Sequence, residues 1–301
     1  MQTNHTNFSQ RLLKLSNATQ VVKSPLFIIY RPHRLAIKGT HTREIMELIK
    51  PGDILVRSYN HYLSGLFLQG TFTHVGFYLG EINETHLKQL AKINNPTQFK
   101  FGKQMVIHAS DAQVHLDDLI DFCRCDGLAV MRFPRQLKPL TNQPLPETLQ
   151  AYFANPIQVT QEAIPTYSKS TTDNNNKNNS ERPPSVAPTS QLDAADLALI
   201  KAEKDIAQHL IQGKGIEFEK IFKILYRLAL RELTAPHFYR FNIEPFYLTA
   251  STELVYFITK SIIWNYGVEP QPVRLFFRQQ CIIMPDMFVD SNLEEIWKVV
   301  G

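Results

Sequence analysis

Residues 71–80 read Thr71-Phe72-Thr73-His74-Val75-Gly76-Phe77-Tyr78-Leu79-Gly80. Successive side chains of a β-strand face opposite sides, so a strand here would carry Thr73, Val75, Phe77 and Leu79 on one apolar face. That face is typical of the core side of a sheet. His74 falls on the other face together with Gly76. Because Gly76 has no side chain, we expect another element to approach this face closely.

Further strands and helices are predicted on both sides of this segment. The patterns indicate strands at 51–56, 105–109, 128–133 and 274–283. They indicate helices at 42–49, 60–69, 116–123 and 292–300, and two more within 192–234, broken at 213–215. The second of these two has an apolar stripe that should pack on the sheet, formed by Ile221, Ile224, Leu225 and Leu228.

One segment stands apart in composition. Residues 156–191 contain almost no large apolar side chains and include a run rich in asparagine. Such a segment buries too little surface to repay the entropy of ordering. We therefore expect a flexible insertion at about 156–191.

A serine at the start of a predicted helix is the strongest functional candidate. Residues 250–256 read Ala250-Ser251-Thr252-Glu253-Leu254-Val255-Tyr256. Counted from Ser251, positions +3, +4 and +7 are apolar, so Ser251 lies on the inward face of the helix. Free N–H groups at a helix start favour a thiolate or an oxyanion. Taken alone, the segment is more typical of an ordinary N-cap or first-turn serine.

Four motifs in a fixed order carry a resemblance to a known family. They are Gly52-Asp53-Ile54-Leu55, Thr73-His74-Val75-Gly76, Val106-Ile107-His108-Ala109 and Ser251-Thr252-Glu253-Leu254-Val255-Tyr256. In this order the chain resembles the circularly permuted branch of the NlpC-type, papain-like cysteine hydrolases, above all the YiiX/YebB-like group. Lecithin:retinol acyltransferase-like enzymes are more distant relatives. Residues 283–288 also resemble the family's Pro-x-Asp-Leu-like ending, and the likeness covers about 48–133 and 237–290.

The resemblance implies a fold and a division of the chain. The implied fold is α+β and permuted papain-like, with a small antiparallel sheet packed against a helix that bears the nucleophile. Residues 1–47 would be an N-terminal extension and residues 48–301 the hydrolase domain, including the insertion.

The resemblance also implies roles for individual residues. Position 251 would hold the nucleophile, His74 would be the general base, and His108 would orient His74. The implied activity is hydrolysis of an amide or thioester through an acyl-enzyme, without a cofactor. From the residues alone, we expect Asp53 to brace its own turn and Glu253 to satisfy the helix end.

The family has a cysteine where this chain has Ser251, and no cysteine lies nearby. A serine hydroxyl is far less acidic than a thiol, so much slower catalysis is expected. Either an engineered Cys→Ser substitution keeps the shape and blocks turnover, or the natural protein uses serine or is inactive. The otherwise intact motifs favour the engineered substitution.

Two other functions stay open. A lipid-directed phospholipase or acyltransferase would need an apolar groove beside His74, with Tyr62, Leu66 and Phe67 on its rim. A catalytically inactive binding module would keep the pocket without turnover, and a natural serine at 251 would support it. Peptides, amides or acyl compounds are the substrates expected of the favoured hydrolase.

Composition narrows the remaining classes. The formal charge of +4 over 301 residues, with both signs dispersed, gives no footprint for nucleic acid. No run of about eighteen apolar residues predicts a transmembrane segment. The first twenty residues lack an apolar signal core, so we expect a cytoplasmic protein, or one exported without a cleavable signal. Peripheral membrane contact and the oligomeric state stay open.

Three cysteines argue against a disulfide framework. Cys123 and Cys125 are separated by one residue, too few for a usual zinc knuckle, and no second pair completes a site. We therefore predict no metal site.

Overall fold

The structure, a computed structural model, describes residues 20–23, 26–29, 35–59, 70–110, 113–137, 201, 204–206, 208–209, 212–234, 250–260, 266–275 and 278–300. The helix expected at 60–69 and the insertion expected at 156–191 lie outside these residues. The described part is mixed α+β. Its elements are β1 (Gln20–Lys23), β2 (Leu26–Ile29), α2 (Gly39–Leu48), β3 (Ile54–Ser58), β4 (His74–Ile82), α3 (Glu84–Gln89), η2 (Pro96–Gln98), β5 (Gly102–Ser110), β6 (Gln113–Asp118), α4 (Leu119–Phe122), β7 (Gly127–Arg132), β8 (Gln136–Leu137), β9 (Ile216–Glu217), α8 (Phe218–Arg231), α9 (Ala250–Lys260), β10 (Gln271–Leu275), β11 (Arg278–Ile282), α10 (Asp286–Val289) and β12 (Glu294–Val299).

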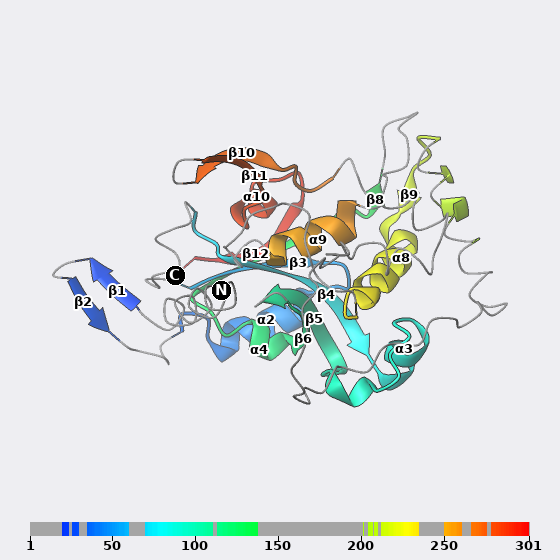
Figure 1. Cartoon of the computed structure of the whole chain (residues 1–301), viewed down its shortest axis with the longest axis horizontal. Helices are drawn as coiled ribbons and strands as arrows, with labels where there is room; N and C mark the ends of the chain where they lie inside the picture. Colours follow the sequence, from blue (N-terminus) through cyan, green and yellow to red (C-terminus); the bar gives the residue numbers. More distant parts are fainter. Residues whose placement is uncertain are drawn as a thin grey trace, which may run out of the picture.

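An antiparallel sheet of six strands forms the centre of the fold, in the order β12-β7-β3-β4-β5-β6 (Figure 1). Strand β4 lies near its middle, where His74 pairs with Arg57 of β3 and Phe77 pairs with Ile107 of β5. The strands predicted from 51–56, 71–80, 105–109 and 128–133 are confirmed as β3, β4, β5 and β7. Residues 271–282 add a separate hairpin of β10 and β11.

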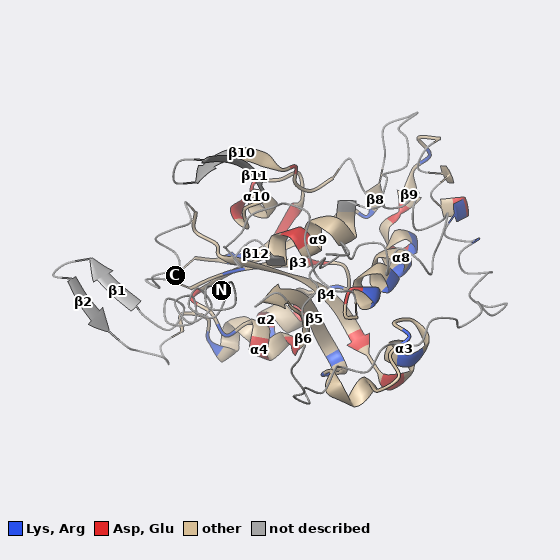
Figure 2. Ribbon diagram, viewed as in Figure 1, with Lys and Arg blue, Asp and Glu red and all other residues tan. Residues whose placement is uncertain are grey.

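Helices cover both faces of the sheet (Figure 1). The predicted apolar face of β4 packs on α8 and α9, in a buried cluster that includes Val56, Val75, Phe77, Ile221, Ile224, Leu225, Leu254, Val255 and Ile258. The stripe of α8 is therefore buried as predicted, while Lys220 and Lys223 stay exposed. Figure 2 shows Lys or Arg residues on α8. The opposite face packs on α2 and α4, in a second cluster that includes Ile45, Leu55, Tyr78, Val106, Leu119, Phe122 and Val130.

Gly76 is the point of closest approach on the His74 face, as its missing side chain predicted. A Cβ atom placed on Gly76 would lie 2.6 Å from Val106 Cγ1 and 2.7 Å from the ring of Phe122. The α4 helix can therefore reach the sheet only because position 76 has no side chain.

The prediction of a helix at 116–123 is wrong for its first part. Residues 113–118 form strand β6, which pairs with β5 from Met105↔Asp118 to Ser110↔Gln113. Val114 and Leu116 are buried, whereas His115 between them is partly exposed. The alternation of buried and partly exposed residues is short, and the segment is polar. Its pairing with β5 therefore determines that it forms a strand.

The prediction of a final helix at 292–300 is also wrong. Residues 294–299 form β12, which pairs with β7 with a bulge between Glu295 and Trp297. Ile296, Trp297 and Val299 pack against the second cluster. The apolar spacing of this segment suits a helix locally, but β7 offers unpaired backbone groups that a strand satisfies.

The expected boundary between residues 47 and 48 falls inside α2. Ile37 and Ile45 belong to the second buried cluster, and the Ile37 amide donates to the Cys125 carbonyl. This part of the expected N-terminal extension therefore belongs to the domain.

Replacing Gly76 by alanine tests the close approach of α4. We expect Gly76→Ala to lower the free energy of unfolding by about 1–3 kcal/mol, because the new methyl group overpacks the contact with Val106 and Phe122. The matched control is Gly39→Ala, at a position where a Cβ meets nothing within 4 Å. Urea unfolding of both variants decides the matter, and equal stabilities would contradict the contact.

Candidate functional site

Ser251 is buried against β4 at the start of α9, with 1% of its surface exposed. The Val75 amide donates a hydrogen bond to Ser251 Oγ at 3.3 Å. The pairing of β4 with β5 ends at Phe77↔Ile107. The Tyr78 amide donates toward β3, to the Asp53 carbonyl. Amides alternate along a strand, so the Val75 amide points toward β5, where Ser251 takes the place of a strand partner.

His74 and His108 form the predicted histidine pair. His74 Nε2 lies 3.0 Å from His108 Nδ1, and the two ring centroids are 4.9 Å apart. His74 is the first residue of β4 and partly exposed, whereas His108 on β5 is 3% exposed. The Phe122 ring of α4 packs on both imidazoles, at 5.9 Å and 5.4 Å between centroids.

Asp117 and Lys100 extend the pair, and the sequence analysis did not find them. Asp117 Oδ2 lies 2.9 Å from His108 Nε2, and Lys100 Nζ lies 2.7 Å from Asp117 Oδ1. Asp117 is on β6, opposite Val106 of β5. Only the register between β5 and β6 brings the carboxylate to His108, and no local sequence pattern reveals that register.

Arg57 is a second residue that the motifs did not indicate. It pairs with His74 across β3 and β4, and its guanidinium lies 4.1 Å from the centroid of the Phe122 ring. Burial lowers the pKa of His74 well below its ordinary value, and the charge of Arg57 lowers it further. Burial also lowers the pKa of His108, and the hydrogen bond with Asp117 opposes this shift only in part. Both rings are therefore neutral near pH 7.

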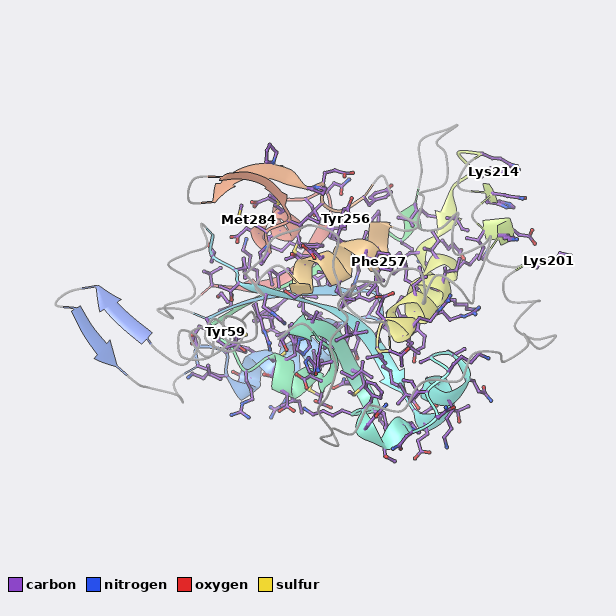
Figure 3. The ribbon with its side chains drawn as sticks, viewed as in Figure 1. Tyr59, Lys201, Lys214, Tyr256, Phe257 and Met284 are labelled. Carbon is purple, nitrogen blue, oxygen red and sulfur yellow. The ribbon has the colours of Figure 1, made fainter. Side chains whose placement is uncertain are left out.

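The segment at residues 283–286 ties the Ser251 helix to the His74 strand. Thr252 Oγ1 donates to the Ile283 carbonyl at 2.8 Å. The carboxylate of Asp286 accepts from the Thr71 amide at 2.8 Å and from the Phe72 amide at 3.1 Å. Met284 marks this segment in Figure 3, where Tyr256 and Phe257 mark α9. The hydrogen bonds of Ile283 and Asp286 thus fix the start of α9 and the residues just before β4 to the same short segment.

The distance between Ser251 and His74 is bounded by the backbone. Since Ser251 Oγ contacts the Val75 nitrogen, standard bond lengths put it within about 6 Å of His74 Cα. In the part of the chain that the structure describes, no hydrogen bond joins the Ser251 hydroxyl to the His74 ring. The three predicted site residues therefore lie in one region. The His74 and His108 rings contact each other, and Ser251 Oγ contacts the backbone of β4.

The cysteines offer no rival nucleophile among the described side chains. Cys123 and Cys125 are buried and free, and burial raises the pKa of each thiol to about 12. The side chain of Cys281 lies outside the described residues. Within the described ranges, no group of three or more His, Cys, Asp or Glu residues is arranged to hold a metal ion. Asp53 braces its turn as predicted, accepting from the Lys50 amide at 2.7 Å, and also pairs with Arg132.

Comparisons of the chain with protein-family models, with curated proteins and with solved structures found no match. Among the described helices, none is both long and apolar enough to cross a membrane.

Glu253, two residues after Ser251, is a buried acid. It is 6% exposed, and burial raises the pKa of its carboxyl to about 7. A carboxyl group whose pKa is higher in the folded chain than in the unfolded chain lowers the stability of the protein as the pH rises from the unfolded-state pKa to the folded-state pKa.

Replacing Glu253 by glutamine removes this pH dependence. We expect Glu253→Gln to be more stable than the parent by about 3 kcal/mol at pH 8 and by less than about 1 kcal/mol at pH 5. Urea unfolding at both pH values measures the difference. Burial also raises the pKa of Glu232 to about 7, but that carboxyl contributes equally to both proteins. A stability difference that does not change with pH would show that Glu253 stays ionised when folded.

Proposed function

We propose that the chain has a permuted papain-like fold and belongs to the cysteine hydrolases that cleave an amide or thioester through an acyl-enzyme. In this proposal position 251 is the nucleophile site, His74 is the general base, His108 orients His74, and no cofactor takes part. One observation carries the proposal. The Val75 amide donates to Ser251 Oγ, one residue from a histidine whose ring already contacts a second histidine.

The surroundings of Ser251 suit an ionised nucleophile. An amide that donates to the side chain at 251 stabilises a negative charge there, and a helix start adds the favourable end of its dipole. The imidazole of His74 is neutral, so it can accept the proton of the nucleophile. The positive end of the α9 dipole would also favour the oxyanion of the tetrahedral intermediate.

Serine at position 251 explains why this form would turn over slowly. We propose that it stands in place of a cysteine, because a neutral imidazole and a helix start activate a thiol far better than an alcohol. The reaction with cysteine would proceed by transfer of the thiol proton to His74, attack on the carbonyl, and return of that proton from His74 to the departing amine or thiol. Water would then hydrolyse the acyl-enzyme with His74 as the base.

One observation favours a binding module as the second candidate. Ser251 has 1% of its surface exposed and makes its hydrogen bond with the backbone rather than with His74. A purely structural serine would make the same contact. The rim proposed for a lipid-directed enzyme, Tyr62, Leu66 and Phe67, lies outside the described residues.

Alkylation of a Ser251→Cys protein tests the proposal. The Val75 amide, the helix start and His74 should lower the pKa of the new thiol from about 8.5 toward the papain-like range. Near neutral pH each unit raises the thiolate fraction by up to about tenfold, until the pKa falls below about 7 and the thiol is mostly ionised. We expect iodoacetamide to label position 251 faster than Cys123, Cys125 or Cys281, as followed by peptide mass spectrometry.

A second substitution separates catalysis from simple exposure. Adding His74→Ala should slow labelling at 251 and abolish any amide or thioester hydrolysis that Ser251→Cys confers. The matched control is His115→Ala, since the His115 ring lies 5.9 Å from the His108 ring but contacts the Ser110 carbonyl instead. If the new thiol reacts no faster than the three existing cysteines, or if losing His74 changes nothing, the binding module becomes the better explanation.

A further inference from the structure

Four polar groups stand in one line behind the nucleophile position. From one end they are His74 on β4, His108 on β5, Asp117 on β6 and Lys100, which precedes β5. The three contacts between them measure 3.0, 2.9 and 2.7 Å. Each group thus uses one atom toward each neighbour in the line.

The donors and acceptors of this line determine where the protons lie. The two hydrogen bonds and the nearby charge of Lys100 lower the pKa of Asp117 strongly, so its carboxylate can only accept. His108 Nε2 must then carry a proton and donate it to Asp117 Oδ2. Since His108 is neutral, its Nδ1 has no proton and can only accept. His74 Nε2 must therefore carry a proton, and His74 Nδ1 is left with a free lone pair.

This assignment leaves His74 Nδ1 unprotonated, which is the nitrogen that a base for position 251 would use. In an imidazole, Nδ1 is the ring nitrogen nearer to the main chain. Ser251 Oγ contacts the main chain at the next residue, Val75. The base needed at the nucleophile is therefore the nitrogen that the line leaves unprotonated.

Lys100 fixes the orientation of the carboxyl group at 117. It donates to Asp117 Oδ1, while Oδ2 faces His108. Lys100 also lies 3.5 Å from Asp121 Oδ2, and among the described residues no hydrogen bond joins Asp121 to His74 or His108. The lysine thus makes the two oxygens of Asp117 distinct.

We propose that Asp117, held by Lys100, is a positioning residue that sets the proton positions on both His108 and His74 and so leaves His74 Nδ1 free to act as the base. The effect on proton positions rests on the described contacts, together with an ionised Asp117 and a neutral His108. Its consequence for catalysis rests on the function proposed above.

Asparagine at position 117 provides a sharp test, because Lys100 should hold the amide oxygen in the Oδ1 place. The amide NH₂ would then face His108 Nε2 and turn that nitrogen into an acceptor. His108 Nδ1 would carry the proton and donate it to His74 Nε2. His74 Nδ1 would become protonated and could no longer accept a proton.

Histidine tautomers are read directly from long-range ¹H–¹⁵N correlation spectra of the full-length Ser251 protein, with each ring assigned by its single substitution to glutamine. In the parent we expect Nε2–H on both rings. In Asp117→Asn we expect Nδ1–H on both, and in Asp117→Ala a mixture, because the constraint is lost. Parent-like tautomers in both variants would overturn the proposal.

Removing the lysine tests the role of Lys100. In Lys100→Met/Asp117→Asn the amide can rotate its oxygen toward His108, so the parent tautomers should return. A role of Asp117 in stability alone would give no such rescue. The matched control is Asp121→Asn, which removes the other carboxylate near Lys100 and should leave both tautomers unchanged. If the double variant keeps the tautomers of Asp117→Asn, Lys100 does not help to set the tautomers of His74 and His108.

Labelling in the Ser251→Cys background separates this proposal from the proposed function. Asp117→Asn should slow alkylation at 251, and Lys100→Met/Asp117→Asn should restore it. If the tautomers change as expected but labelling does not, the positioning role stands and the pairing of His74 with position 251 fails. If labelling depends on His74 while the tautomers ignore Asp117, the proposed function stands and the positioning role fails.

Discussion

The hydrogen bonds of residues 283–286 are the constraint on which the site depends. Asp286 holds the amides of Thr71 and Phe72, just before β4, and the Ile283 carbonyl holds Thr252 on α9. The strand that carries His74 and the helix that carries Ser251 are therefore bound to the same short segment. A carboxylate that accepts from two amides is a strong anchor, because hydrogen bonds to a charged group exceed those between neutral groups. The Val75–Ser251 contact can form because both of its ends are already placed.

The sequence indicated three residues that the structure brings into one region. Ser251, His74 and His108 were singled out because each lies in a short motif that can be recognised without knowledge of the fold. Asp117 and Arg57 were not found, since they reach the histidines only through the registers of β6 on β5 and of β3 on β4. Asp286 belonged to a recognised ending, but its amide partners lie more than two hundred residues earlier. Strand pairing across such distances has no local signature.

The helices and strands show the same difference between local patterns, which the sequence reveals, and long-range strand pairing, which it does not. The strands with long apolar runs, β4 and β5, were predicted from the sequence, as was the stripe of α8. The two segments that were predicted as helix but form strands, β6 and β12, are those whose conformation the local periodicity describes least well. Both strands are short and rich in acidic residues, and each takes its conformation from a neighbouring strand rather than from its own pattern.

The contact between Val75 and Ser251 also has a consequence for the order of events during synthesis. The two residues are separated by 176 positions. At roughly 5–20 residues per second, His74 would leave the ribosome on the order of 10–35 s before its partner helix. Throughout that interval β4 lacks α9, and β7 lacks β12, so the nascent chain exposes an apolar sheet face and an open edge. A chaperone that shields exposed strands would have its longest opportunity here.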